Sequence, residues 1–120
     1  MKHITQQMTL DLGELVTVKY LKGATLSERF DQFDQSNPHV YKNLLRLTRK
    51  AVAAGMRRCS IATLYEQLRW HYGLHTGGRD YKLNNSFRAF YVRRLLAEDG
   101  VPPTFFETRR SAADREVPTC

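Results

Sequence analysis

The chain has 120 residues, a size typical of one domain, and a formal net charge of +7 at pH 7. No stretch approaches the roughly 20 apolar residues of a membrane span, and the N-terminus lacks the apolar core of a signal peptide. Cys59 and Cys120 are too few for a disulfide framework or a zinc site, so we expect a cytoplasmic protein without metal or cofactor.

The excess positive charge is concentrated in the middle of the chain. Residues 38–94 contain twelve Lys/Arg and two Asp/Glu, a net charge of +10, whereas residues 1–37 and 95–120 have net charges of −1 and −2. A segment this basic indicates a polyanionic partner, such as nucleic acid, an acidic protein surface or an anionic membrane.

The N-terminal residues 1–22 alternate apolar and polar side chains. This fits two short strands in a β-hairpin or one irregular arm. We expect residues 23–109 to form one helical domain and residues 110–120 a flexible tail.

Two helix starts are marked by capping signals. Thr25 and Glu28 have the spacing of a capping box, which predicts a short helix after Thr25. Asn37 is predicted to cap the next helix, with Pro38 as its first residue and Gly55 at its C-terminal cap.

Ser60 is predicted to cap a third helix that ends near Gly73. The polar loop after it contains a Gly-Gly pair and fits a tight turn, which would form a short wing carrying Arg79 and Lys82.

Asn84 or Asn85 caps the last long helix, which is predicted to end near Gly100. That helix is apolar around much of its circumference, which predicts a central position in the core. Arg88 falls inside the apolar arc, so it is expected to snorkel or to pair with a carboxylate: Asp31, Asp34 or Glu107.

A helical wheel separates an apolar from a basic face in helix 38–54. The basic face has five members and no acid: His39, Lys42, Arg46, Arg49 and Lys50. Like charges on one face repel. The pattern therefore favours an anion-binding surface, although acids from elsewhere in the fold could also neutralise it.

The polar side of helix 60–72 carries Thr63, Gln67, Arg69 and Trp70. A tryptophan in such company most often packs under a neighbouring segment, here the 74–83 loop or the N-terminal arm. The alternative is that Trp70 stacks on a base or inserts into a partner.

Helices 38–54 and 60–72 are joined by a short segment that carries Arg57 and Arg58. Such a pair is reminiscent of a helix-turn-helix, with a turn about two residues longer than the tight version, as in winged-helix proteins. We therefore predict a mostly α-helical bundle of about four helices.

Four blocks of residues 30–109, "FDQFDQSNPHVY", "LYEQLRWHYG", "YKLNNSFRAFYVRRL" and "FFETR", resemble a family of small proteins encoded by bacteriophages, prophages and bacterial genomes. The NPHVY, RW and KLNN parts are its more specific features. The resemblance implies a phage or mobile-element setting, in a bacterial host cell, and no catalytic residues.

No metal-ligand spacing, phosphate loop or catalytic triad stands out, so we predict no enzymatic activity. The leading hypothesis is a small DNA-binding protein, with double-stranded DNA as the partner and a homodimer as an alternative to the monomer. Its phosphate contacts would come from Lys42, Arg46, Arg49, Lys50, Arg57 and Arg58, and its exposed reading residues would be Thr63, Gln67, Arg69 and Trp70. The alternatives are a module that binds an acidic host protein, and an RNA binder that uses Trp70 and exposed tyrosines for stacking.

Overall fold

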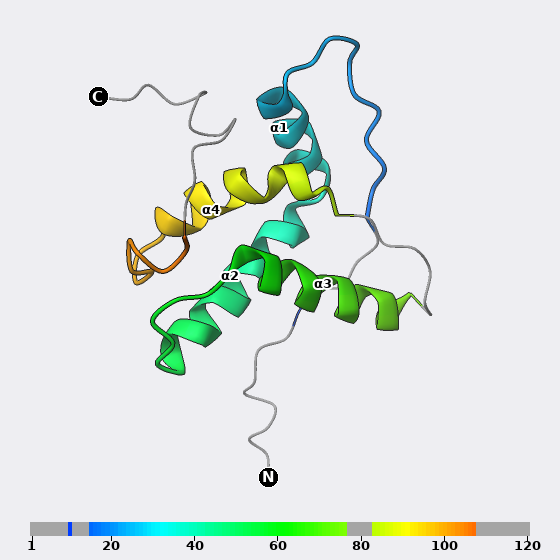
Figure 1. Cartoon of the computed structure of the whole chain (residues 1–120). Helices are drawn as coiled ribbons and strands as arrows, with labels where there is room; N and C mark the ends of the chain where they lie inside the picture. The colour runs from blue at the N-terminus through cyan, green and yellow to red at the C-terminus, as the bar shows by residue number, and fades with distance from the viewer. Residues whose placement is uncertain (1–9, 11–14, 77–82, 108–120) are drawn as a thin grey trace, which may run out of the picture.

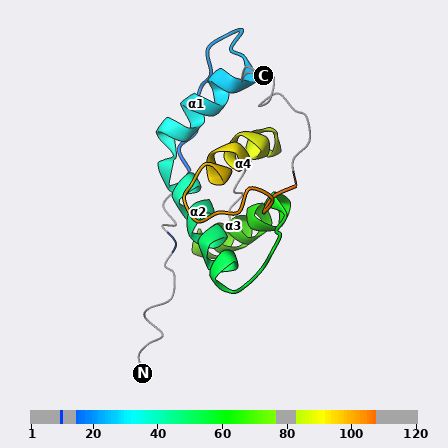
Figure 2. The ribbon, with the colours of Figure 1, turned by 90° about the vertical axis from the view of Figure 1, so that its left-hand side faces the viewer.

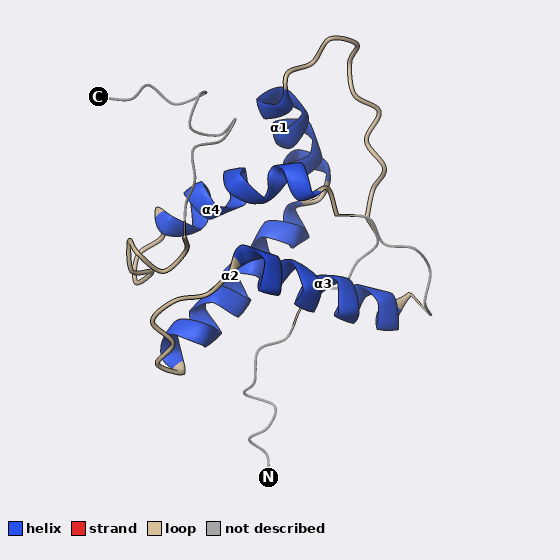
Figure 3. Cartoon of the chain, viewed as in Figure 1, coloured by secondary structure: helices blue, strands red, loops and turns tan. Residues whose placement is uncertain are grey.

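The computed structural model describes residues 10, 15–76 and 83–107 of the chain (Figure 1). Its elements in chain order are α1 (Leu26–Ser36), α2 (Pro38–Ala53), α3 (Ile61–His75), the short 3-10 helix η2 (Asn85–Phe87) and α4 (Arg88–Leu96). The described residues contain four α-helices and no strand (Figure 3), which confirms the mostly α-helical bundle. Residues 15–22 form no strand, and the rest of the predicted arm, like the predicted tail 110–120, lies outside the described residues.

The capping box before α1 is confirmed. The Glu28 amide donates to Thr25 Oγ1 at 3.1 Å, and the Glu28 carboxylate accepts from the Thr25 amide at 2.8 Å. Thr25 and Glu28 are three residues apart, so both hydrogen bonds are local and do not depend on contacts with the rest of the fold. They fix the first turn of α1, from which Phe30 and Phe33 enter the core.

Asn37 precedes α2 at the predicted position, but its side chain does not cap the helix. Its Oδ1 accepts from the Val16 amide at 2.6 Å, while its Nδ2 donates to the carbonyls of Val16 at 3.0 Å and Phe33 at 3.2 Å. A carboxamide carries both a donor and an acceptor, so it can pair with both backbone groups of one residue. Asn37 therefore holds the N-terminal segment against the helices. Pro38 begins α2 as predicted.

The predicted ends of the helices were partly right. Gly55 follows α2 with a φ of +91°, a conformation that favours glycine at a helix C-terminus. Ser60 caps α3 by accepting from the Ala62 amide at 3.1 Å. The end near Gly73 is wrong, because α3 continues to His75 and Gly73 has no positive φ. A helical glycine costs about 1 kcal/mol, which the packing of a long helix can offset.

Asn84 accepts from the Ser86 amide at 2.8 Å and so caps η2, which leads directly into α4. Gly100, beyond the end of α4, has a φ of +86°. The central position predicted for this segment is confirmed, since most of its apolar side chains are buried: Phe87, Phe90, Tyr91, Val92 and Leu95. Arg88 has no carboxylate partner among the described residues, and its Nε donates to the Asn85 carbonyl at 3.2 Å.

An aromatic cluster surrounds Tyr91, whose side chain is fully buried. Its ring centroid lies 4.9 Å from that of Phe30, 6.4 Å from that of Tyr41 and 6.3 Å from that of Tyr65. Three helices thus meet α4 through a single side chain. Aromatic pairs at such distances add to the stabilisation that comes from burial alone.

The segment after α4 folds back across the bundle to the connection between α2 and α3 (Figure 2). The Cys59 amide donates to the Phe105 carbonyl at 2.9 Å, and Cys59 and Phe106 form an isolated parallel bridge. Phe105 and Phe106 are buried, as is Val101. Val101, Phe105 and Phe106 therefore belong to the core.

Candidate nucleic-acid interface

The α2 outer face is formed by Lys42, Arg46, Arg49 and Lys50, all of them exposed. The opposite side of α2 buries Val40, Leu44 and Thr48. The Thr48 hydroxyl donates to the Leu44 carbonyl at 2.8 Å, which satisfies this buried polar group. Packing of that side against the bundle thus directs the basic side chains outward, as the wheel predicted.

Acids from elsewhere in the fold neutralise only part of this face. The Arg49 guanidinium lies 3.6 Å from the Glu98 carboxylate, and Arg46 donates to Asn43 Oδ1 at 3.4 Å. Within residues 15–76 and 83–107, Arg49 is the only member of the face with a carboxylate partner. Arg57 and Arg58, in the connection to α3, are exposed as well. Six cations are thus exposed on α2 and on the connection that follows it.

His39 does not belong to the basic face, contrary to the wheel. Its Nδ1 lies 2.6 Å from the Tyr72 hydroxyl of α3, and the two rings meet edge to face at 5.7 Å. Asn43, fully buried one turn later, donates to the same hydroxyl at 2.7 Å. The flank of α2 that carries His39 and Asn43 is therefore covered by α3.

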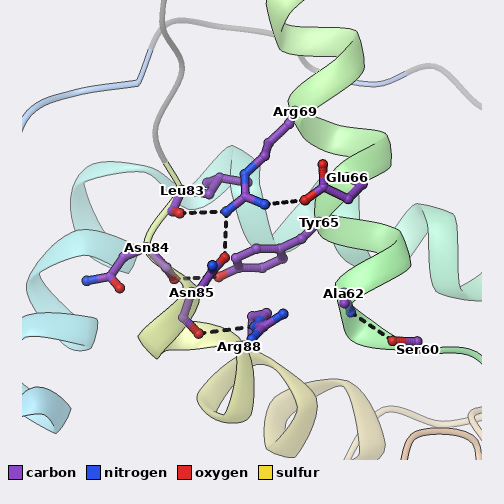
Figure 4. Close-up of polar contacts among 9 residues, drawn as sticks. All are labelled: Ser60, Ala62, Tyr65, Glu66, Arg69, Leu83, Asn84, Asn85 and Arg88. Atoms are coloured by element: carbon purple, nitrogen blue, oxygen red, sulfur yellow. Dashed lines mark hydrogen bonds and ion pairs between the residues drawn. The ribbon is translucent and has the colours of Figure 1, made fainter.

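Arg69 was expected to be an exposed reading residue, and the structure contradicts this (Figure 4). Its guanidinium pairs with Glu66 and donates to the Leu83 carbonyl at 3.0 Å and to Asn85 Oδ1 at 2.5 Å. The same group lies 5.5 Å from the centre of the Tyr65 ring. Arg69 thus joins α3 to Leu83 and to the first residue of η2, and its guanidinium makes three hydrogen bonds within the protein.

Arg94 has a similar structural role on α4. It pairs with Asp34 at 2.5 Å, and its guanidinium carbon lies 3.8 Å from the centre of the Tyr41 ring. The Tyr41 hydroxyl donates to the Glu98 carboxylate. Burial of Tyr41 and this hydrogen bond raise the pKa of its hydroxyl far above the ordinary value.

Trp70 is 65% exposed, so the prediction that it packs under a neighbouring segment is wrong. Thr63 and Gln67 are exposed beside it, as predicted. Leu74, which was not predicted to be a surface residue, is 63% exposed on the same side of α3. Leu74 follows Trp70 by four residues, so the two side chains share a face if both belong to the helix. The sequence prediction ended the helix near Gly73 and therefore did not place Leu74 on this face. The α3 outer face thus consists of Thr63, Gln67, Trp70 and Leu74.

The exposed tyrosines that an RNA binder would use are not found among the described residues. Tyr41, Tyr65, Tyr72 and Tyr91 are buried, and Tyr20 is half-buried. Every described phenylalanine is buried as well. Trp70 is therefore the only mostly exposed Phe, Tyr or Trp side chain in the part of the chain that the structure describes.

The remaining predicted features have different outcomes. Arg79 and Lys82, with the predicted wing, lie outside the described residues. Residues 54–60 join α2 to α3, a connection longer than the predicted turn, and the bond from Cys59 to Phe105 holds it.

Two features are absent from the described residues. No three His, Cys, Asp or Glu side chains gather at a place that would hold a metal ion. None of the described helices combines the length and apolar character needed to cross a membrane.

Comparisons of the chain with protein-family models, curated proteins and solved structures found no match. The resemblance to phage-encoded proteins thus stays a prediction.

Proposed function

We propose that this protein binds nucleic acid, with DNA as the preferred candidate, and that it does not catalyse a reaction. Its phosphate contacts come from the α2 outer face and from Arg57 and Arg58. The observation that carries the proposal is the outward row of Lys42, Arg46 and Lys50, which has no carboxylate partner among the described residues. Lysine and arginine ammonium and guanidinium groups in such a row neutralise phosphates and release their counterions. The protein would act in the cytoplasm of a bacterial cell.

Phosphate contacts of this kind give affinity with little sequence information. About six contacts correspond to a slope of about −5 for duplex DNA when the logarithm of the binding constant is plotted against that of the salt concentration. The predicted reading role of α3 is reduced, because the Arg69 guanidinium makes three hydrogen bonds within the protein.

A charge-reversal experiment tests the proposal. The double variant Lys42→Glu/Arg46→Glu should lower the affinity for a labelled oligonucleotide by about a hundredfold at low salt, measured by fluorescence anisotropy. Its melting temperature should stay close to that of the wild type, because both side chains are exposed. The matched control, Lys19→Glu/Lys22→Glu, makes the same change of charge at two exposed positions outside α2. Equal losses in both variants would contradict a site on α2.

An acidic surface of a host protein is the second candidate partner. The exposed Trp70 and Leu74 favour it, because large aromatic anchors are common at the centres of protein interfaces. A folded wild-type protein that binds neither duplex, single-stranded DNA nor RNA at low salt would exclude the first candidate and leave this one.

A further inference from the structure

Glu98 lies beside the α2 outer face, in the turn that follows α4. The Glu98 amide donates to the Leu95 carbonyl at 3.1 Å, and the Glu98 carbonyl accepts from the Val101 amide at 3.3 Å. Leu95 and Val101 are both buried in the core. The backbone of Glu98 is therefore fixed on both sides, so its side chain starts from a defined position.

The Glu98 carboxylate is shared between two side chains of α2. Its Oε2 accepts from the Tyr41 hydroxyl, and its Oε1 lies 3.6 Å from the Arg49 guanidinium. Tyr41 is itself held in the core, where its ring stacks on that of Tyr91. A hydrogen bond from a fixed hydroxyl to a carboxylate is a strong one. It keeps the negative charge of Glu98 beside α2 even when Arg49 turns away.

Helix geometry explains why Glu98 reaches Arg49 and not the next residue, Lys50. Arg49 follows Tyr41 by eight residues, which places the two side chains about 80° apart around the helix axis. Lys50 follows Tyr41 by nine residues and is about 180° away from it. Since the Tyr41 side of α2 packs against α4, Arg49 forms the border of the outer face toward α4 and Lys50 lies on the far side of that face.

A phosphate and the Glu98 carboxylate compete for the same guanidinium. The side chains of Arg49 and Glu98 are 55% and 31% exposed, so their ion pair adds little to stability. It matters for binding, because a phosphate that contacts Arg49 has to replace this carboxylate and approach a fixed negative charge. No such replacement is needed at Lys42, Arg46 and Lys50, which have no carboxylate partner among the described residues.

We propose that Glu98 limits the affinity of the α2 outer face for nucleic acid, by competing with phosphate for Arg49 and by repelling phosphate at the border toward α4. The phosphates then follow Lys42, Arg46 and Lys50, which succeed one another at about 6 Å along the helix axis. Arg49 contributes less to binding than the other three cations. This inference rests on the proposed function and specifies what controls the affinity of that same site.

Glu98→Gln tests the proposal, because it removes the charge and keeps an oxygen that accepts from Tyr41. Its affinity for a labelled duplex oligonucleotide at low salt, measured by fluorescence anisotropy, should rise by about threefold to fivefold. The matched control is Asp99→Asn, which makes the same change of net charge at the next residue. Asp99 is exposed and has no ion pair among the described residues, so the control should raise the affinity by less than about twofold.

A second comparison needs no change at Glu98. Arg49 and Lys50 are adjacent and both exposed. Lys50→Ala should lower the affinity by about fivefold, as for the loss of one phosphate contact, and Arg49→Ala by less than about twofold. When each is combined with Glu98→Gln, the two substitutions should have equal effects, because the carboxylate no longer competes. Equal losses already in the presence of Glu98 would overturn the inference.

The outcomes separate this inference from the proposed function. Equal gains in Glu98→Gln and Asp99→Asn, together with weak binding by Lys42→Glu/Arg46→Glu, would overturn the role of Glu98 and leave phosphate binding on α2 intact. A gain from Glu98→Gln that persists undiminished in the presence of Arg49→Ala would overturn the competition for Arg49. No binding of any nucleic acid by the folded wild type would overturn both proposals and point to a protein partner.

Discussion

The arginines of the α2 outer face carry the same guanidinium group as Arg69 of α3 and Arg94 of α4, but the two groups of arginines have different neighbours. Arg46 points to solvent and meets only a neighbouring amide, whereas Arg69 and Arg94 are held by partners from other parts of the chain. The basic character of the central segment therefore has two separate uses. One set of cations connects the helices, and the other set faces outward.

The acidic partners explain how the two sets are divided. Asp34 and Glu98, which pair with Arg94 and Arg49, lie in the flanking ranges with net negative charge. The flanks fold back on the basic centre and neutralise the cations near α4. They leave Lys42, Arg46 and Lys50 without such a partner among the described residues.

The largest effect among inward-facing polar groups is expected for Asn37→Ala. The variant loses three hydrogen bonds of a fully buried side chain, two of which hold Val16. We expect the free energy of unfolding to fall by about 3 kcal/mol, measured by urea denaturation. The exposed Lys42→Ala serves as the control and should change stability by less than about 0.5 kcal/mol. A loss for Asn37→Ala as small as the control's would show that the N-terminal segment is not held by this amide.

The second effect concerns the ion pair on α4. Arg94→Met keeps the apolar stem but leaves Asp34 without its partner and Tyr41 without the guanidinium above its ring. We expect a loss of about 2 kcal/mol, less than for a fully buried pair, because both groups are partly exposed. A double-mutant cycle with Asp34→Asn measures the coupling of the two side chains. A coupling energy near zero would mean that Arg94 does not depend on Asp34, and that it resembles the cations of α2 in having no stabilising carboxylate partner.

A smaller loss is expected for Arg69→Met. The variant removes the bonds to Glu66, Leu83 and Asn85 at the partly exposed edge of α3, so we expect a loss of about 1.5 kcal/mol in thermal unfolding. The affinity of the folded protein for nucleic acid should stay the same. A drop in affinity without a change in stability would return Arg69 to the binding surface and remove the distinction between the two sets of arginines.

The smallest expected change in stability concerns a buried polar group that, unlike Asn37, has no hydrogen-bond partner among the described residues. The Tyr91 hydroxyl is buried and has no hydrogen-bond partner among the described residues. Tyr91→Phe removes the cost of burying this oxygen and leaves only a small gap, so we expect stability to rise by up to about 1 kcal/mol in urea denaturation. A loss of more than about 1 kcal/mol would show that the hydroxyl has a bonding role.

Features with local causes were predictable from the sequence. The bonds between Thr25 and Glu28 and the cap at Ser60 join residues that are two or three positions apart. The apolar stripe of α2 repeats at helical spacing, so its outer face followed as well. These features depend on neighbours in the chain, which a sequence displays directly.

Features with distant causes were not predictable. Asn37 could equally have capped α2, and only the approach of Val16, 21 residues away, decides its role. Arg69 looked exposed on a wheel because its partner Leu83 is 14 residues away. The exposure of Trp70 had the same difficulty, since burial depends on whether another segment covers the side chain.

The position of Phe105 and Phe106 in the core has a consequence for synthesis of the protein in the cell. A chain grows from its N-terminus at about 5–20 residues per second, and these two rings come after all four helices. The α2–α3 connection acquires its bond from Cys59 to the Phe105 carbonyl only when these residues have left the ribosome. The helices must therefore emerge with part of their apolar surface uncovered, and the native state is completed after the segment beyond α4 is released.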